Sequence, residues 1–391
     1  MFNQPSERQE RGQVLVIVAM SLLVLIALVG LVIDGGLAWG HQRNTQNVAD
    51  ATAKAGATVL AERLAGATRA DGDVLSAVDA TADANGLEDL VAYYTDDQGR
   101  LLTPAGGLAA NTATAAVVGG GSIPTGAAGV MSEGELTFDT MLARVIGFTE
   151  FTTTADATAI AGYRTSSCPA SAGCVVLPVT LPITILGCDG SNNPAPVEPA
   201  QQWELGVFYT LPLCKNGPGN VGWLDWTPTG GGTSELVDAI ESPNNPALKW
   251  PGWYYITSTG NVNSKSVEDA INDNYNGQVV SIPLFDVTCD AEPTGPGGDD
   301  CPAGHEGGNG SNQWYHLVGM AALRLCGPGM SECGTFTQGA YITGSNPQCD
   351  TGNGGTSCLA GLFEQILEEG EVSSNPPPNA DIAQVGIQLI D

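Results

Sequence analysis

The sequence predicts an α+β protein: an N-terminal transmembrane helix that extends into a long helix, followed by a β-rich, disulfide-stapled extracellular domain. Two observations predict this class. An uncharged apolar run at residues 14–33 leads into a proline-free stretch that reaches residue 65. From about residue 166, short apolar runs alternate with turn clusters rich in Gly, Pro and Asn, and all ten cysteines lie there.

The apolar run is long enough to cross a membrane. Its twenty residues include six Leu, three Ile and six Val. At about 1.5 Å per residue they span about 30 Å, the thickness of the hydrocarbon core. These fifteen side chains contribute about −5 to −9 kcal/mol to insertion. The alternative is a cleaved signal peptide, with Gly36 and Ala38 placed like a cleavage site, but apolar regions of signal peptides run only about 7–15 residues. A retained single-pass anchor is the prediction.

Beyond the membrane the helix is expected to continue to Gly66. Small and apolar residues recur there on one face, at Ala49, Ala53, Gly56, Leu60 and Leu64. Such a stripe permits close helix–helix approach, as does the pair Gly36 and Gly40. Two interpretations stay open: lateral association, including a homo-oligomer through this helix, or packing on the protein's own ectodomain.

The next hundred residues predict a small α+β region. Asp73 is expected to cap a helix over residues 74–85 that Gly86 ends. Residues 90–102 predict a β-hairpin turning at 97–99, and residues 103–129 a loop. A short helix over 136–146 and a strand over 151–163 follow.

The remainder predicts a β-rich domain of Greek-key or barrel type. Residues 359–369 are expected to form its one clear helix, and three prolines at 376–378 precede a last strand. The predicted organisation is therefore a membrane anchor and extended helix (1–66), a small α+β region (67–165) and a β-rich cysteine-containing ectodomain (166–391).

The cysteines are even in number and form no C-x-x-C pair, so disulfides are favoured over metal ligation. Disulfides require an oxidising compartment. We therefore expect a cytoplasmic N-terminus and an extracellular C-terminal domain in the cell membrane, although Arg8 and Arg11 give only a weak positive flank. The expected pairs join neighbours in sequence, with other connectivities left open: Cys168–Cys174, Cys188–Cys214, Cys289–Cys301, Cys326–Cys333 and Cys349–Cys358.

The net charge of −29 argues against nucleic acid as a partner, because no basic patch could release phosphate counterions. Calcium binding by acidic loops is a weaker alternative to simple solubility. Its candidate ligands are Asp299, Asp300 and Glu306, and residues 272–277 faintly resemble a calcium loop. We predict no cofactor and no metal site.

No catalytic motif is recognisable. The three histidines are His41, His305 and His316, and His316 is better explained as a packed strand residue than as a base. No nucleophile elbow, HExxH, P-loop or dinucleotide fingerprint is present. The tryptophans of the ectodomain are better explained as core or turn anchors than as a glycan platform. The chain is therefore predicted not to be an enzyme.

The N-terminal segment resembles the TadE/TadG-like proteins of Flp (tight-adherence) pilus assembly. Their pattern is RGQ, an apolar helix, D-x-G, then Q-x-x-A-D-x-A-x-x-A-G-A. The matching positions here include Gly12, Gln13, Asp34, Gly36, Gln46, Asp50, Ala53 and Gly56. Prepilin-like relatives place a Glu five residues after the processing glycine, where this chain has Ile17.

The resemblance implies a non-catalytic, membrane-anchored structural or assembly component, pseudopilin-like or a scaffold, of a Flp/Tad-type pilus or related secretion apparatus. Its partners would be the membrane and other pilus-assembly or envelope proteins. The alternative is a membrane-tethered surface-binding module, or a hydrolase acting on glycan or peptidoglycan, unrelated to pili. Neighbouring genes for a secretion ATPase, a prepilin peptidase and small Flp-type pilins would favour the first.

Overall fold

The chain forms two compact units in the computed structural model. The first unit comprises Met1–Val59, Ala70–Ile160 and Leu389–Asp391, and the second comprises Leu60–Arg69 and Ala161–Gln388. The structure describes residues 7–188, 194–196, 202–212, 222–224, 226, 232–256, 265–294, 300–307, 313–325 and 358–390.

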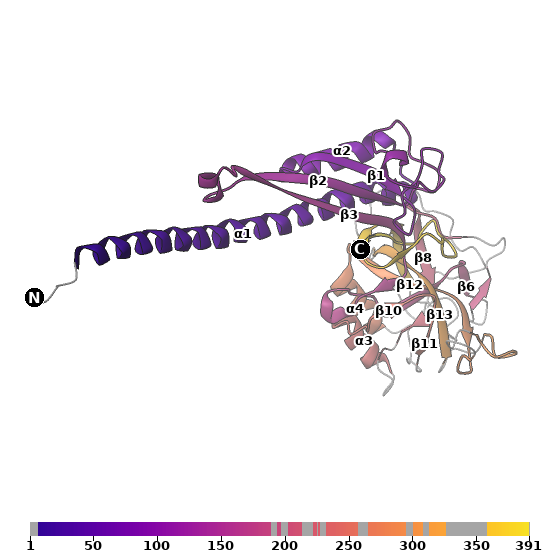
Figure 1. Ribbon diagram of the computed structural model, residues 1–391. Helices are drawn as coiled ribbons and strands as arrows, with labels where there is room; N and C mark the ends of the chain where they lie inside the picture. The colour runs from indigo at the N-terminus through magenta and orange to yellow at the C-terminus, as the bar shows by residue number, and fades with distance from the viewer. Residues whose placement is uncertain are drawn as a thin grey trace, which may run out of the picture. The chain divides into compact units, whose positions relative to one another are not determined.

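The first unit consists of two helices and an antiparallel meander. Its elements are α1 (Glu7–Leu64), α2 (Asp71–Asn85), β1 (Glu88–Thr95), the 3₁₀ turn η1 (Thr112–Thr114), β2 (Gly129–Asp139), the 3₁₀ turn η2 (Ala143–Ile146) and β3 (Glu150–Arg164). The last residues of α1, from Leu60, and of β3, from Ala161, are counted with the second unit. β2 pairs with β1 on one side and with β3 on the other. Figure 1 shows the β2–β3 hairpin running alongside α1. The predicted long N-terminal helix is confirmed as one continuous element.

The helix boundaries follow local sequence chemistry. Gly66 and Gly86 have left-handed φ angles of 91° and 71°, and they follow the ends of α1 and α2 as predicted. α2 begins at Asp71 rather than at residue 74. Asp73 occupies the third helical position, where its carboxylate accepts a 2.7 Å hydrogen bond from the backbone N–H of Ala70.

The predicted helix over residues 136–146 is wrong. Residues 136–139 are the end of β2, where Phe138 lies opposite Phe151 and Thr137 opposite Thr152. These cross-strand pairs of aromatic and β-branched residues favour the sheet over a helix. The strand expected over 151–163 is confirmed as β3. The hairpin expected over 90–102 is also confirmed, because Thr95 pairs antiparallel with Leu101 and the Leu102 N–H donates to the Tyr94 carbonyl at 3.0 Å across a turn that contains Gly99. β1 pairs in addition with β2.

The second unit is mainly β-structure, as predicted. One sheet has the order β8-β14-β13-β12-β5-β9, with β11 also paired to β13. Its strands are β5 (Val179–Pro182), β8 (Phe208–Pro212), β9 (Gly222–Trp223), β11 (Gly252–Ile256), β12 (Val279–Cys289), β13 (Gln313–Leu325) and β14 (Cys358–Glu364). The remaining elements are β4 (Ser166–Ser167), the 3₁₀ turn η3 (Ala170–Ala172), β6 (Leu186–Cys188), β7 (Pro194–Pro196), β10 (Leu248–Lys249), β15 (Leu367–Glu369), β16 (Val372–Ser373) and β17 (Val385–Ile390).

Two helices, α3 (Thr233–Glu241) and α4 (Lys265–Tyr275), pack with these strands in one hydrophobic core. The hydroxyl of Tyr275 donates to the carbonyl of Ile240 at 2.7 Å and so joins the two helices. The helix predicted over residues 359–369 is wrong. These residues form β14 and β15, because the fully buried Phe363 pairs with Leu323 inside the sheet.

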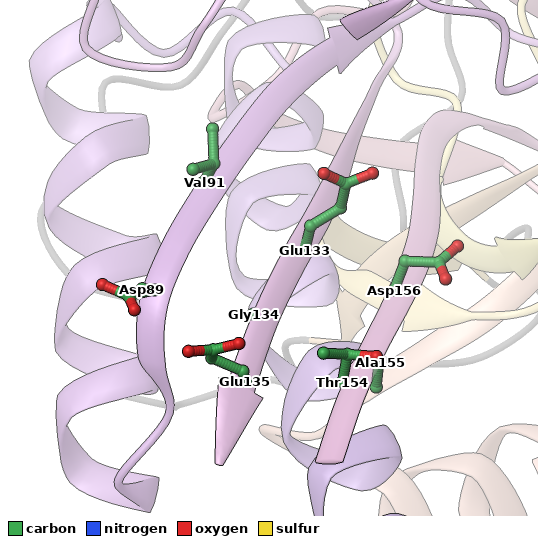
Figure 2. A pocket seen from close by; sticks show the side chains of 8 residues that line it. All are labelled: Asp89, Val91, Glu133, Gly134, Glu135, Thr154, Ala155 and Asp156. Carbon is green, nitrogen blue, oxygen red and sulfur yellow. The ribbon is translucent and has the colours of Figure 1, made fainter. Parts of the chain in front are cut away.

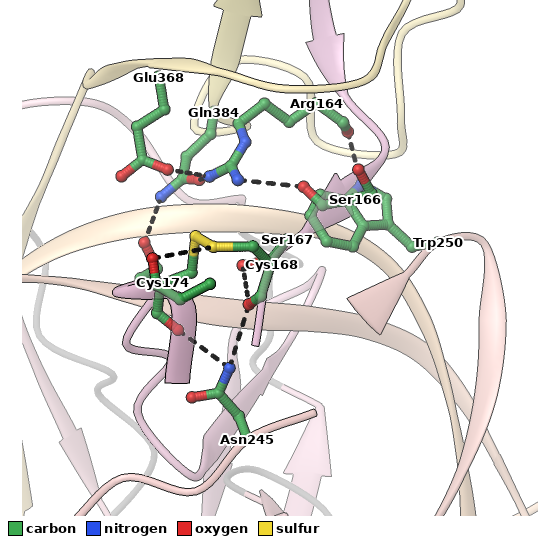
Figure 3. Close-up of polar contacts among 11 residues, drawn as sticks. Arg164, Ser166, Ser167, Cys168, Cys174, Asn245, Trp250, Glu368 and Gln384 are labelled. Carbon is green, nitrogen blue, oxygen red and sulfur yellow. Dashed lines mark hydrogen bonds and ion pairs between the residues drawn. A yellow bond between two sulfur atoms is a disulfide. The ribbon is translucent and has the colours of Figure 1, made fainter. Parts of the chain in front are cut away.

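A buried arginine organises the start of the second unit (Figure 3). The Arg164 side chain, 3% exposed, is paired with Glu368 and donates to Gln384 Oε1 at 2.7 Å and to the Ser166 carbonyl at 3.0 Å. The Arg164 carbonyl accepts from the indole N–H of Trp250 at 2.6 Å. This network joins the end of β3 to β4 and β15, and the carboxylate of Glu368 compensates the buried positive charge of Arg164.

Two disulfides, Cys168–Cys174 and Cys289–Cys301, are present in the described residues. Both are among the predicted sequence-near pairs. The other three predicted pairs involve side chains outside the described part of the chain.

Candidate functional site: the motif-bearing helix and its sheet

The carboxylate of Asp34, the first charged residue after the apolar run, binds the loop between β2 and β3. We call this loop, residues 140–149, the hairpin tip. Asp34 accepts hydrogen bonds from the backbone N–H groups of Met141 (2.9 Å), Leu142 (3.0 Å) and Ala143. These donors lie at the start of η2, so the carboxylate caps that turn as an acid caps a helix N-terminus. The motif aspartate therefore fastens the hairpin tip to α1.

About two and three turns further along α1, two motif-region amides reach β3. The Nε2 atoms of Gln42 and Gln46 donate to the carbonyls of Thr154 and Asp156, both at 2.9 Å. Gln46 also donates to Asp50 Oδ1 at 3.0 Å, which orients its amide. Because each amide bonds a backbone oxygen, this contact fixes α1 along β3.

The small residues of the motif lie where α1 touches the rest of the first unit. Ala49 and Ala53 are fully buried. A Cβ on Gly56 would lie 2.9 Å from Val130 Cγ2 and 3.0 Å from Val78 Cγ2, so β2 and α2 both approach the helix there. Of the two interpretations of the stripe, the structure places these residues in packing within the first unit.

The other motif residues lie elsewhere. Gly36 and Gly40 have open space where a Cβ would stand. Gly12 and Gln13 belong to the first turns of α1, and their side chains lie outside the described part. Asp34, Gln46, Ala53 and Gly56 are thus brought together against the sheet, and Gly36 is not.

Sequence reasoning missed a second buried carboxylate, Asp71 at the start of α2. It accepts from the Tyr94 hydroxyl (2.7 Å) and from the backbone N–H groups of Gly119 (2.9 Å) and Gly121 (2.6 Å). Burial alone would raise the pKa of Asp71, but these hydrogen bonds outweigh it and the pKa is lowered. The run of three glycines at 119–121 is the sequence signal, because left-handed glycines expose backbone donors to an anion.

The opposite face of the meander carries an acidic groove of about 320 Å³ (Figure 2). Ser132 faces α1, where its hydroxyl donates to the Ala49 carbonyl, so the alternation of a strand places Glu133 and Glu135 on the other face. The groove is lined by Asp89, Val91, Glu133, Gly134, Glu135, Thr154, Ala155 and Asp156. Among the described residues, no group of three or more His, Cys, Asp or Glu is arranged to hold a metal ion.

The carboxyls in the groove influence one another. A hydrogen bond with Asp89 raises the pKa of Glu135, and partial desolvation and the negative charges of Asp89 and Glu88 act in the same direction. The groove thus concentrates negative charge on an exposed sheet face, where it would attract cationic groups.

The histidines of the second unit are held in local contacts. His316 Nδ1 lies 2.7 Å from Asp286 Oδ1, and its ring packs on Trp253 with centroids 4.9 Å apart. This agrees with the prediction of a packed strand residue in β13. His305 Nδ1 lies 2.7 Å from Asp290 Oδ1.

Most of the segment that faintly resembles a calcium loop, residues 272–277, is helical. Its first four residues, 272–275, belong to the last turn of α4 rather than to a loop. Of the candidate acidic ligands, Asp300 forms a backbone β-bridge with Thr294, and Glu306 forms one with Cys289. Asp299 lies outside the described residues.

The helix that carries Asp34, Gln46 and Gly56 is also where the chain is similar to known proteins. Residues 12–59 match the family model described as Putative Flp pilus-assembly TadE/G-like. The predicted resemblance is confirmed for this TadE/G-like segment. Comparison with curated proteins and with solved structures gave no match. Among the described residues, one helix is long and apolar enough to cross a membrane, within Val14–Leu64.

Gly56→Ala tests the close packing of the TadE/G-like segment. The added methyl group would meet Val130 and Val78, so we expect the packing of α1 to lose about 1–3 kcal/mol. Gly35→Ala is the matched control in the same helix, because its Cβ meets open space and alanine favours the helix by about 1 kcal/mol. The measurement is amide exchange of β2 in the full chain. Equal effects of the two substitutions would contradict the packing.

Asp89→Asn tests the coupling in the acidic groove. Asn tolerates the positive φ of 45° at this position, removes the charge and donates to Glu135, so the pKa of Glu135 should fall toward its ordinary value. Because a raised carboxyl pKa destabilises the folded state as pH rises through that pKa, the variant should be more stable near neutrality.

A ¹³C NMR titration of the Glu135 carboxyl makes this measurement. Asp156→Asn, in the same groove but outside the groups that shift Glu135, is the control and should move the titration less. An unchanged midpoint in Asp89→Asn would rule the coupling out.

Proposed function

We propose that this protein is a membrane-anchored, non-catalytic structural or assembly component, a scaffold or pseudopilin-like subunit, of a Flp/Tad-type pilus or related secretion apparatus. The TadE/G-like match and the apolar N-terminal helix fit a Tad pilus-assembly component. Assembly, the role named in the description of the matched family, is structural rather than catalytic.

One observation carries the proposal: the TadE/G-like segment is a single helix with two different surroundings. Apart from Gly30, residues 14–33 are exposed on every side of α1, whereas residues 48–61 include the fully buried Ala49, Ala53 and Ala57. The apolar half is therefore the part offered to lipid and to neighbouring subunits, and the second half holds the folded unit. Because α1 is one continuous helix, its anchoring in the membrane would also fix the position of the folded unit that packs on its second half.

For lateral partners we propose the face of α1 that carries Gly36 and Gly40. Both positions have open space in the described structure, and small residues four apart allow another helix to approach closely. Ala49, Ala53 and Gly56 are no longer available for this, because the first unit covers them. A second copy of this chain and other envelope proteins are the candidates.

For topology we propose a cytoplasmic N-terminus and an extracellular second unit. The disulfides Cys168–Cys174 and Cys289–Cys301 support this, since such bonds persist in oxidising compartments.

The test replaces Gly36 and Gly40 by Leu in the host that encodes the chain. If the proposal holds, deletion of the gene abolishes surface pili or the secreted product. The double variant should insert into the membrane normally. It should reduce piliation about tenfold or more, as a loss of roughly 1.4 kcal/mol or more of association free energy predicts. Gly35→Leu, also in open space, is the control and should leave assembly intact.

Two further readouts come from the same cells. Alkaline phosphatase fused after Asp391 should be active, which reports the outside location. Normal piliation and secretion in the deletion strain would contradict the proposal, and loss of peptidoglycan or polysaccharide turnover there would favour the enzyme alternative instead.

A further inference from the structure

The hairpin tip reaches the level of the apolar part of α1. Gly30 is buried although it lies inside the apolar run, and the residue that covers it is Leu142. A Cβ on Gly30 would lie 3.3 Å from Leu142 Cβ and 3.6 Å from Leu142 Cδ1. Gly30 precedes the end of the run at Ile33 by three residues, or about 5 Å along the helix. The hairpin tip therefore extends past the polar boundary that Asp34 marks.

The hairpin tip exposes two large apolar side chains. Met141 is 63% exposed and Phe148 is 59% exposed, and both belong to the same loop as Leu142. Exposed apolar side chains at the end of a hairpin are unfavourable in water, and they indicate a surface that contacts another apolar phase or molecule. Next to a membrane-spanning helix it continues the apolar surface of that helix.

The backbone of the hairpin tip is suited to an apolar surrounding. A non-helical segment at membrane depth must satisfy its own polar groups. The N–H groups of Met141, Leu142 and Ala143 bind Asp34, and the N–H of Phe148 donates to the Ala143 carbonyl at 3.1 Å. The hydroxyl of Thr140 donates back across the loop to the carbonyl of Phe148.

The charged residues limit how deep the hairpin tip can go. Asp139 and Glu150 pair across the base of the loop, so the hydrocarbon boundary lies on the tip side of them. Arg144 turns back toward this base, donating from Nε to the Thr140 carbonyl at 2.7 Å, with Nη2 3.8 Å from Asp139 Oδ1. On α1, the exposed ring of Trp39 suits the headgroup level, where Trp is enriched.

We propose that the hairpin tip is a second membrane contact, in which Met141, Leu142 and Phe148 enter the lipid leaflet on the C-terminal side of α1. The occupant of this apolar surface is the acyl-chain region of that leaflet. The helix and the tip then hold the first unit at two points, which fixes its rotation about the α1 axis. The inference needs α1 to be a membrane anchor and does not depend on a role in pilus assembly.

The experiment places a Trp at the tip of the full chain. Phe148→Trp and, separately, Met141→Trp are made in a Trp39→Phe background and reconstituted in phosphatidylcholine–phosphatidylglycerol vesicles whose upper acyl chains are brominated. The other six Trp residues all follow residue 200. Bromine should quench the added emission by about half or more, as burial about 5–10 Å below the surface predicts.

Leu108→Trp is the matched control, because Leu108 is also exposed, at 57%, in a loop of the first unit away from the tip. Its added emission should respond to iodide in the water and not to the brominated lipid. Two independent tip variants with native circular dichroism guard against misfolding of one. Iodide quenching of both tip variants without bromine quenching would overturn the proposal, and resistance to both quenchers would show a protein partner in place of lipid.

Discussion

The bond between Asp34 and the hairpin tip is the constraint on which the first unit depends. α1 leaves the apolar run and immediately presents one carboxylate to three backbone N–H groups of the β2–β3 loop. Hydrogen bonds to an ionised acceptor are stronger than neutral ones, and Asp34 itself is buried. A single residue thus sets where along the helix the hairpin ends. The amides of Gln42 and Gln46 then hold β3 along the same helix.

The rest of α1 maintains the same register with small side chains. Gly56 allows β2 and α2 to come within van der Waals contact of the helix, and the buried Ala49 and Ala53 leave room for the sheet. Their alignment with Asp34 on one face explains why the TadE/G-like motif combines an acid, amides and small residues. Each residue type satisfies a different requirement of one helix–sheet contact, and the apolar half of the helix remains available for the membrane.

Much of this could be predicted from the sequence where one physical signal dominates. The apolar run, β3 and the helix-ending Gly86 each follow from local patterns, and Cys168–Cys174 and Cys289–Cys301 join near neighbours. The helices predicted over residues 136–146 and 359–369 are wrong because the apolar spacing of these segments also fits a helix, while the pairing of Phe138 with Phe151 and of Phe363 with Leu323 is non-local. The bond from Asp34 spans 107 residues to Met141, so no local pattern could show it. The same holds for the cover that Leu142 gives to Gly30.

Hydrogen exchange at the hairpin tip tests this account most directly. In the full chain in lipid, the amides of Met141, Leu142 and Ala143 should be protected, and Asp34→Ala should raise their exchange rates about tenfold or more, since a hydrogen bond to a charged group contributes about 1.5–3 kcal/mol. The amide of Tyr94 in β1, bonded to the Ala116 carbonyl, should exchange as before. Unchanged rates at all three tip amides in Asp34→Ala would show that the carboxylate does not hold the hairpin, and would contradict the account.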